Sequence, residues 1–151
     1  MSHAERFWAK ADKSGDCWTW TGVKSGRGYG NFKLAGSMRQ AHRVAYELAN
    51  GPIPPGMFID HTCHTKHCVR PEHLRLATNK QNMENQIGAH ANSRSGYRGV
   101  VRTDGRWTAK ATHYGRTYYA GTHATPEEAA EAAKQLRLSL FSHNDMDRKT
   151  A

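Results

Sequence analysis

Apolar and polar positions change period several times along the first half of the chain, and each change predicts a different element. Helical spacing over residues 3–12 predicts a short helix. Tryptophans alternate with threonines in residues 17–23, and this segment and residues 28–34, joined by a glycine-rich turn, predict a hairpin. Helical spacing returns over residues 38–48 and ends at an Asn-Gly step and a proline-rich stretch. The first half therefore mixes helices with short strands.

The next segments predict a strand, a helix and then a change of domain. Residues 57–60 favour a short strand, and residues 77–87 can form a helix. A small, polar stretch without periodicity follows, which is typical of a linker. We expect an α+β protein with a first domain over 1–88, a linker over 89–96, a second domain over 97–142 and a tail over 143–151.

The second domain follows a different pattern. Residues 97–123 contain three β-prone runs divided by Asp104-Gly105 and Tyr114-Gly115, both hairpin turn signals, so they predict a three-stranded antiparallel sheet. A helix should follow, because Thr125 is a good N-cap and Glu128 completes a capping box. The apolar stripe expected to pack on the sheet is Ala129, Ala133, Leu136 and Leu140.

Composition and charge narrow the class of partner. The chain has 151 residues, of which 37% are apolar, and 22 Lys and Arg against 13 Asp and Glu give a net charge of +9. Positive charge spread along a globular chain suits a polyanion such as nucleic acid, although a basic soluble surface is the simpler alternative. The charged N-terminal segment is unlike a secretory signal, and no segment reaches the roughly 18 apolar residues of a membrane span. We therefore expect an intracellular protein without a membrane partner.

The three cysteines point to a metal rather than to a disulfide framework. Cys63, Cys68 and His73 are spaced as C-x4-C-x4-H, and Cys17 is the remaining cysteine. Together these four residues make the Cys3His set of a structural zinc site with no thiol left over. The alternative is a set of buried, reduced thiols.

Two neighbouring histidines compete for the same role. His64 and His67 each lie beside a cysteine, where the chain must turn, and they rank below His73 as ligands.

A second group of polar residues, within residues 59–82, suggests a hydrolytic site. Asp60 and Asn82 offer the hard oxygen ligands that suit Mg²⁺ or Mn²⁺, and His61 can take a proton from water near neutral pH. One metal ion, one base and a basic surface favour phosphodiester cleavage.

At this point the sequence resembles a known family. Residues 60–82 resemble the ββα-metal motif of HNH and His-Cys box endonucleases. The resemblance lies in the order of Asp60-His61, Cys63, Cys68, Pro71-Glu72-His73-Leu74, Thr78 and Asn82. The resemblance, which covers about residues 5–87, implies that His61 is the general base and that Asn82 and Asp60 are ligands of the catalytic ion. It also implies a zinc-stabilised finger, since His73 stands where many HNH motifs have a bracing asparagine.

Several residues near the motif have two interpretations. Asn79 or Asn85 replaces Asn82 as the ligand if the helix register differs. His42 and Arg43 either approach the DNA backbone or the phosphate under attack, as arginines often do in this superfamily, or lie on a solvated helix face. Trp18 and Trp20 fit a hydrophobic core better than a base-stacking platform.

The second domain resembles the AP2/ERF DNA-binding domain through the segments YRGVV, GRWTAKA, YYAGTH and TPEEAAEAA, over residues 97–141. This resemblance implies that the sheet lies in the major groove of DNA. The residues argue the same way, because alternation puts cations on one face of the sheet and small or apolar residues on the other. The DNA-contact candidates are Arg98, Arg102, Arg106, Lys110 and Arg116.

These observations lead to one hypothesis and one rival. The hypothesis is a sequence-directed DNA endonuclease of the phage or homing type, which uses Mg²⁺ or Mn²⁺, binds zinc structurally, acts on double-stranded DNA as a monomer or homodimer, and works in the bacterial cytoplasm if phage-encoded. The rival is a non-cleaving DNA-binding regulator whose zinc finger is only structural.

Overall fold

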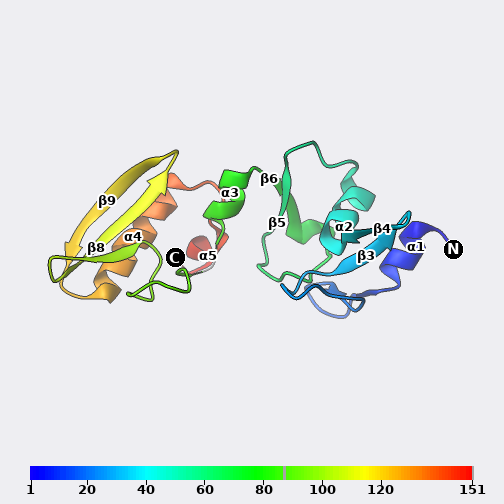
Figure 1. Cartoon of the computed structure of the whole chain (residues 1–151), viewed down its shortest axis with the longest axis horizontal. Coiled ribbons are helices and arrows are strands. Elements are labelled where there is room, and N and C mark those ends of the chain that lie inside the picture. The colour runs from blue at the N-terminus through cyan, green and yellow to red at the C-terminus, as the bar shows by residue number, and fades with distance from the viewer. Residues whose placement is uncertain (87, 151) are drawn as a thin grey trace. The chain divides into compact units, whose positions relative to one another are not determined.

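The chain forms two compact units in a computed structural model that describes residues 1–86 and 88–150 (Figure 1). The first unit is Met1–Asn82 and the second is Met83–Ala151. The division between them falls inside helix α3 (Asn79–Glu84), upstream of the linker expected from the sequence. Each unit is described by itself.

The first unit is built from three antiparallel strand pairs and a central helix. Its elements before α3 are α1 (His3–Trp8), β1 (Ala11–Asp12), β2 (Thr19–Trp20), β3 (Asn31–Leu34), β4 (Ser37–Gln40), α2 (Ala41–Asn50), β5 (Phe58–His61), the 3-10 turn η1 (Pro71–His73) and β6 (Leu74–Ala77). Strand β1 pairs with β2, β3 with β4, and β5 with β6. The β5–β6 hairpin followed by α3 has the strand, strand, helix order of a ββα motif.

The predicted hairpin between residues 17–23 and 28–34 is largely wrong. Strand β2 pairs with β1, and β3 pairs with β4, so that the isolated bridge between Lys24 and Gly30 is what remains of the expected pairing. The helix expected from Met38 begins at Ala41, because Met38 lies in β4 opposite Lys33. The N-terminal helix is also shorter than expected and ends at Trp8.

The core of the first unit is aromatic. Phe7, Trp20 and Phe32 are buried and pack in edge-on or tilted pairs, with 4.9 Å between the ring centroids of Phe7 and Trp20. Gly30 is required beside this cluster, since a Cβ atom there would lie 2.5 Å from the Trp20 ring. Trp20 is therefore a core residue, as expected. Trp18 packs against the same core. The ammonium nitrogen of Lys13 lies 4.3 Å from the Trp18 ring centroid, which is a cation–π contact.

The second unit contains the predicted three-stranded antiparallel sheet and helix. Its elements are β7 (Val100–Thr103), β8 (Arg106–His113), β9 (Arg116–His123), α4 (Pro126–Leu140) and α5 (Asp145–Lys149). Both tight turns have the positive φ pair that their sequences predict, for example 49° at Asp104 and 80° at Gly105. Helix α4 begins with the predicted capping box, in which the Thr125 hydroxyl accepts from the Glu128 N–H.

The buried face of α4 differs from the predicted stripe. Ala129 and Ala133 pack on Val100 and Ala109 as expected, but the next buried position is Arg137 and not Leu136 or Leu140. The Arg137 guanidinium donates to the Asp147 carboxylate, with Nε 2.6 Å from Oδ2. This ion pair holds α5 within the unit, so the segment predicted as a tail is a helix docked on α4.

No helix within the described ranges is long and apolar enough to cross a membrane.

Candidate active site and metal centre

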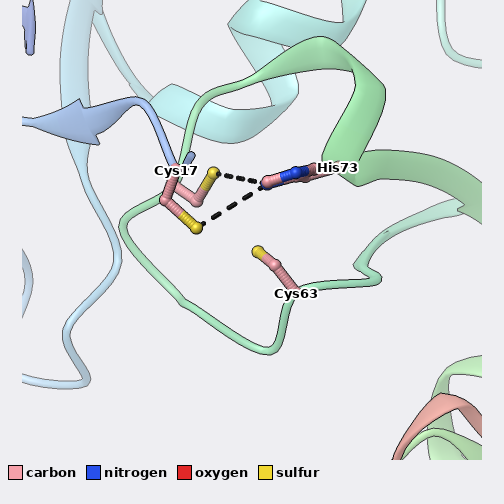
Figure 2. A group of neighbouring side chains, drawn as sticks. Cys17, Cys63 and His73 are labelled. Carbon is pink, nitrogen blue, oxygen red and sulfur yellow. Dashed lines mark hydrogen bonds between the residues drawn. The ribbon is translucent and has the colours of Figure 1, made fainter. Parts of the chain in front are cut away.

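Three cysteines and one histidine converge in the first unit, where Cys17 joins three residues that lie more than 40 positions further along the chain (Figure 2). The ligand atoms of Cys17, Cys63, Cys68 and His73 all lie within 4.8 Å of one another. Nδ1 of His73 is 3.6 Å from Sγ of Cys17 and 3.5 Å from Sγ of Cys68. This is the set expected from the cysteine count, and His64 and His67 do not belong to it.

Backbone pairing explains how Cys17 reaches the other three residues. The Trp20 N–H donates to the His67 carbonyl at 2.9 Å, and the Val69 N–H donates to the Trp18 carbonyl at 2.8 Å. Residues 18–20 and 67–69 are thus hydrogen-bonded side by side, which places Cys17 next to Cys68. This pairing of residues 18–20 with residues 67–69 therefore helps to build the metal centre.

The donor set fits a tetrahedral metal ion such as zinc. Zinc–sulfur bonds of about 2.3 Å and zinc–nitrogen bonds of about 2.0 Å place sulfur and nitrogen about 3.5 Å apart in a tetrahedron. The separations of His73 from two cysteines match that edge. Nε2 of His73 lies 3.6 Å from a carboxylate oxygen of Asp16, the kind of outer partner that orients a metal-binding imidazole.

The thiols are also prepared for metal binding. A hydrogen bond from the Cys68 thiol lowers the pKa of Cys63, against the opposing effect of burial. The same interaction, together with burial, raises the pKa of Cys68. A divalent ion would displace the shared proton, because thiolate is the form that ligates.

His61 lies at the end of β5 and is oriented by the metal loop. Its side chain is buried, and its Nε2 lies 3.1 Å from the backbone carbonyl of Cys68. A carbonyl oxygen can only accept, so Nε2 carries the proton and Nδ1 carries the lone pair. The geometry therefore fixes the tautomer that a general base at Nδ1 requires.

Burial also keeps this imidazole neutral. It lowers the pKa of His61, and this effect outweighs the Cys68 carbonyl and the negative charges of Cys63 and Asp60, which raise it. At neutral pH the ring is unprotonated at Nδ1 and able to accept a proton.

The rings of His42 and Tyr29 also pack around His61. His42 was a candidate from the sequence for an approach to DNA or to the attacked phosphate, whereas Tyr29 was not singled out. The ring centroid of His42, on α2, is 4.8 Å from that of His61, and the Tyr29 ring lies 5.4 Å from His42 and 6.2 Å from His61. His42 is buried, which lowers its pKa to about 3, with additional lowering by His61 and Arg43. Its Nδ1 has no hydrogen-bond partner within the described part of the chain.

Asp60 is buried beside His61 and interacts with an arginine that the sequence analysis missed. Nε and Nη2 of Arg75 donate to Oδ2 of Asp60 at 3.0 and 2.8 Å. The two residues lie directly opposite each other in the β5–β6 ladder, so their opposite charges in facing strands were the available signal.

The asparagine candidates differ in their surroundings. Asn82 lies on α3, half-buried, and its N–H donates to the Thr78 carbonyl at 2.9 Å. Asn79 begins the same helix. Asn85 is buried in the second unit, where its Oδ1 accepts from the Asp145 N–H at 3.0 Å. Asn82 therefore stays the preferred candidate for the ion, and Asn85 already has a structural role.

Arg43 is partly buried on α2, and its Nη1 donates to the Met57 carbonyl at 3.4 Å. Its contact with DNA stays a prediction.

Strand register sorts the cations of the second unit by face. Opposed residues share a face, so Arg102 lies with Trp107 and Arg116 with His113 on the face that α4 covers. Their guanidinium carbons lie 5.5 and 5.3 Å from the ring centroids of Trp107 and Tyr118. Arg106 and Lys110 alternate to the outer face.

The placement of Arg98 on a basic sheet face is wrong. This residue precedes β7, and its guanidinium donates to the carbonyls of Gln86 and Glu84, each at 2.8 Å. Arg98 therefore stabilises the second unit through hydrogen bonds to two backbone carbonyls.

A comparison with known protein families matches a segment that lies mainly in the first unit. Residues 39–84, which include Asp60, His61 and Asn82, match the family described as HNH endonuclease. The match to this family is therefore limited to this segment. The matched range also contains three of the four residues of the metal centre, while Cys17 lies outside it.

Three relatives are viral proteins. Protein 7.7 of Escherichia phage T7 is 38% identical over 72 residues, which cover 48% of this chain and 55% of that protein. Protein 2.8 of the same phage is 32% identical over 87 residues, covering 56% of this chain and 58% of that protein. An uncharacterised HNH endonuclease of Acanthamoeba polyphaga mimivirus is 30% identical over 103 residues, covering 68% of this chain and 53% of that protein.

The chain thus spans about half the length of the curated relatives it matches. No solved structure matches it at a significant level.

Proposed function

We propose that the protein is a metal-dependent, sequence-directed DNA endonuclease of the phage or homing type, in which the HNH domain cuts and the second unit selects the site. The observation that carries this proposal is the hydrogen bond between Nε2 of His61 and the Cys68 carbonyl at 3.1 Å. This bond leaves the lone pair of the imidazole on Nδ1, as a general base at that atom requires.

The chemistry assigned to the chain's own residues begins at His61. Its Nδ1 accepts the proton of a water molecule that attacks the scissile phosphorus in line with the leaving 3′ oxygen. The neighbouring rings of His42 and Tyr29 exclude water from the other side of the imidazole and limit its rotation.

Asp60 and Asn82 would hold the catalytic Mg²⁺ or Mn²⁺, because carboxylate and amide oxygens are hard ligands. When bound, such an ion supplies positive charge to the phosphate and to the leaving oxygen. Arg75 fixes the carboxylate of Asp60 with two hydrogen bonds to Oδ2.

The second unit is proposed to read DNA as AP2/ERF-like domains do. A three-stranded sheet backed by a helix fits the major groove, and Arg106 and Lys110 are the cations on the outer face. Double-strand cutting by one active site per chain would need a homodimer or two successive nicks by a monomer.

One observation favours the rival function of a non-cleaving regulator. The Arg75 guanidinium occupies Oδ2 of Asp60 with two N–H groups, which is the arrangement of a structural ion pair. In that case the finger would bind DNA without cutting it.

A cleavage assay with His61→Ala distinguishes the two functions. Wild type should nick supercoiled plasmid with Mg²⁺ or Mn²⁺, and His61→Ala should be slower by about 10²–10⁴-fold, the usual contribution of a general base. The variant should retain wild-type zinc content and DNA affinity, since His61 is assigned to neither. The proposal fails if wild type that binds DNA cuts none with either ion, or if both proteins cut at the same rate.

A further inference from the structure

A tightly closed loop next to His61 carries cations that the proposed chemistry does not use. The Ser25 N–H donates to the Tyr29 carbonyl at 2.8 Å, and the Gly28 N–H donates to the Ser25 carbonyl at 2.9 Å. Gly28 has a φ of 88°, a conformation that glycine adopts without strain. Lys24 and Arg27 are exposed on this loop. The turn thus presents two basic side chains on an ordered backbone.

Tyr29 connects the loop to the candidate active site. Its half-buried ring packs on His42 and His61, with centroid separations of 5.4 and 6.2 Å. The loop therefore borders the proposed base directly.

A third cation reaches the same place from another segment. Lys66 lies between the metal-centre residues Cys63 and Cys68, is exposed, and has its ammonium nitrogen 5.8 Å from the Tyr29 ring centroid. Its side-chain stem passes Gly28, since a Cβ atom there would lie 3.8 Å from Cδ of Lys66. We call Lys24, Arg27, Tyr29 and Lys66 the basic arm.

The charge around the basic arm is unbalanced. Residues 17–46 contain five Lys and Arg and no Asp or Glu, and residues 61–71 contain Lys66 and Arg70 and no acid. Within residues 1–86 and 88–150, no carboxylate forms an ion pair with a cation of the arm, whereas Arg39, Arg70 and Arg75 each have one. Unpaired cations that converge beside a hydrolytic site are suited to a polyanion.

We propose that the basic arm binds backbone phosphates of double-stranded DNA next to the bond that is cut. This inference rests on the proposed function for the identity of the polyanion. The side chains of Arg27 and Lys66 contact phosphates flanking the scissile one, and Tyr29 supports them. They position the duplex over His61 and take no part in proton transfer.

The test is the salt dependence of DNA binding by the full chain, measured with a duplex oligonucleotide and no added magnesium. Each lost phosphate contact should reduce the slope of log affinity against log salt by about 1, so Arg27→Gln and Lys66→Gln should each lower it by about 1 and the double variant by about 2. The matched control is Lys33→Gln, which makes the same charge change on β3 opposite Met38. Zinc content should stay at the wild-type value in every variant.

The proposal is overturned if the arm variants lower the slope no more than Lys33→Gln does. It is also overturned if, at saturating DNA, the double variant cuts more than about 100-fold slower, because that loss is typical of a group acting in the chemical step. The binding test stands apart from cleavage. If wild type binds DNA but cuts none, the endonuclease proposal fails while the slopes still decide whether the arm binds phosphate.

Discussion

His61 and His42 are adjacent imidazoles whose pKa values are both lowered chiefly by burial. They differ in their hydrogen-bond partners. His61 has a carbonyl acceptor from the metal loop, whereas His42 has its Nδ1 buried without a partner in the described residues. The first arrangement suits proton transfer. The second suits a neutral wall, because a protonated His42 would be desolvated beside another imidazole.

His42 should make the fold sensitive to acid. Its pKa is about 3 in the folded chain and near 6.5 when exposed, so the unfolded state binds the extra proton between these values. The stability that depends on neutral His42 is fully present above pH 6.5 and is lost progressively as the pH falls toward 3. For one proton the loss approaches about 1.4 kcal/mol per pH unit.

Urea unfolding of wild type and His42→Phe at pH 7 and pH 5 checks this. Phenylalanine keeps the ring volume and removes the titration, so the variant should lose less free energy of unfolding between the two pH values than wild type does. Equal losses would contradict the assignment. Comparing the two differences cancels acid effects on the metal centre that both proteins share.

Asn82 should be separable from His61 by metal titration. Asn82→Ala removes an oxygen ligand, so raising Mg²⁺ or Mn²⁺ should partly restore the cleavage rate. His61→Ala lacks the base, and no ion concentration should restore it. Initial rates over a range of metal concentrations give the comparison, with Asn79→Ala as the control on the same helix. If Asn79→Ala cleaved slowly and Asn82→Ala cleaved at the wild-type rate, the metal ligand would be Asn79, one helical turn before Asn82.

Residue type and spacing were enough to predict part of this site. Cys17, Cys63, Cys68 and His73 could be chosen because soft ligands are few, and Asp60 and His61 because they adjoin that window. Tyr29 and Arg75 could not, and the packing of His42 against His61 could not, since these contacts join segments far apart in sequence. The orientation of the Arg98 side chain could not be predicted either, because the carbonyls to which it donates lie on another segment.

At the scale of elements, the metal centre joins segments that have little regular structure of their own. Strands β1 and β2 have two residues each, and η1 has three. Such short strands carry almost no period, which explains why the hairpin prediction failed while the longer strands β8 and β9 were predicted well.

Cys17→Ala should therefore remove zinc and loosen these elements together. A structural site contributes folding free energy directly, so the variant should copurify with well under the one equivalent of zinc expected for wild type and should melt at a lower temperature. Metal analysis and thermal unfolding measure both effects.

Asp16→Asn is the graded comparison, since it keeps the four ligands and alters the carboxylate near Nε2 of His73. It should retain zinc with about 10–100-fold weaker affinity. Full zinc content in Cys17→Ala would show that Cys17 is not a ligand.

At the scale of the whole molecule, the proposal divides cutting from site selection. Arg106→Gln with Lys110→Gln removes the outer-face cations of the sheet, and Arg102→Gln with Arg116→Gln removes the same charge from the face beside α4. The first pair should lose site preference and affinity while keeping metal-dependent, nonspecific cleavage at high enzyme concentration. The second pair should affect site preference much less.

Binding to specific and random duplexes, followed by mapping of cut sites, gives the readout for both pairs. If the Arg102/Arg116 pair causes the larger loss, the outer face is not the DNA-reading surface. The sequence predicted the sheet and its helix, but register decides which cations share a face, and register depends on pairing that periodicity alone leaves open.

Cys68 contributes its sulfur to the metal centre and its carbonyl oxygen to His61. Under the proposed function this double use sets an order of maturation. A newly made chain without zinc would hold residues 63–68 less firmly, and His61 would then be less firmly bound to the carbonyl that selects the reactive tautomer. We expect such a chain to cleave DNA more slowly until it acquires the metal. The supply of zinc would then time the onset of cleavage, independently of how much protein has accumulated.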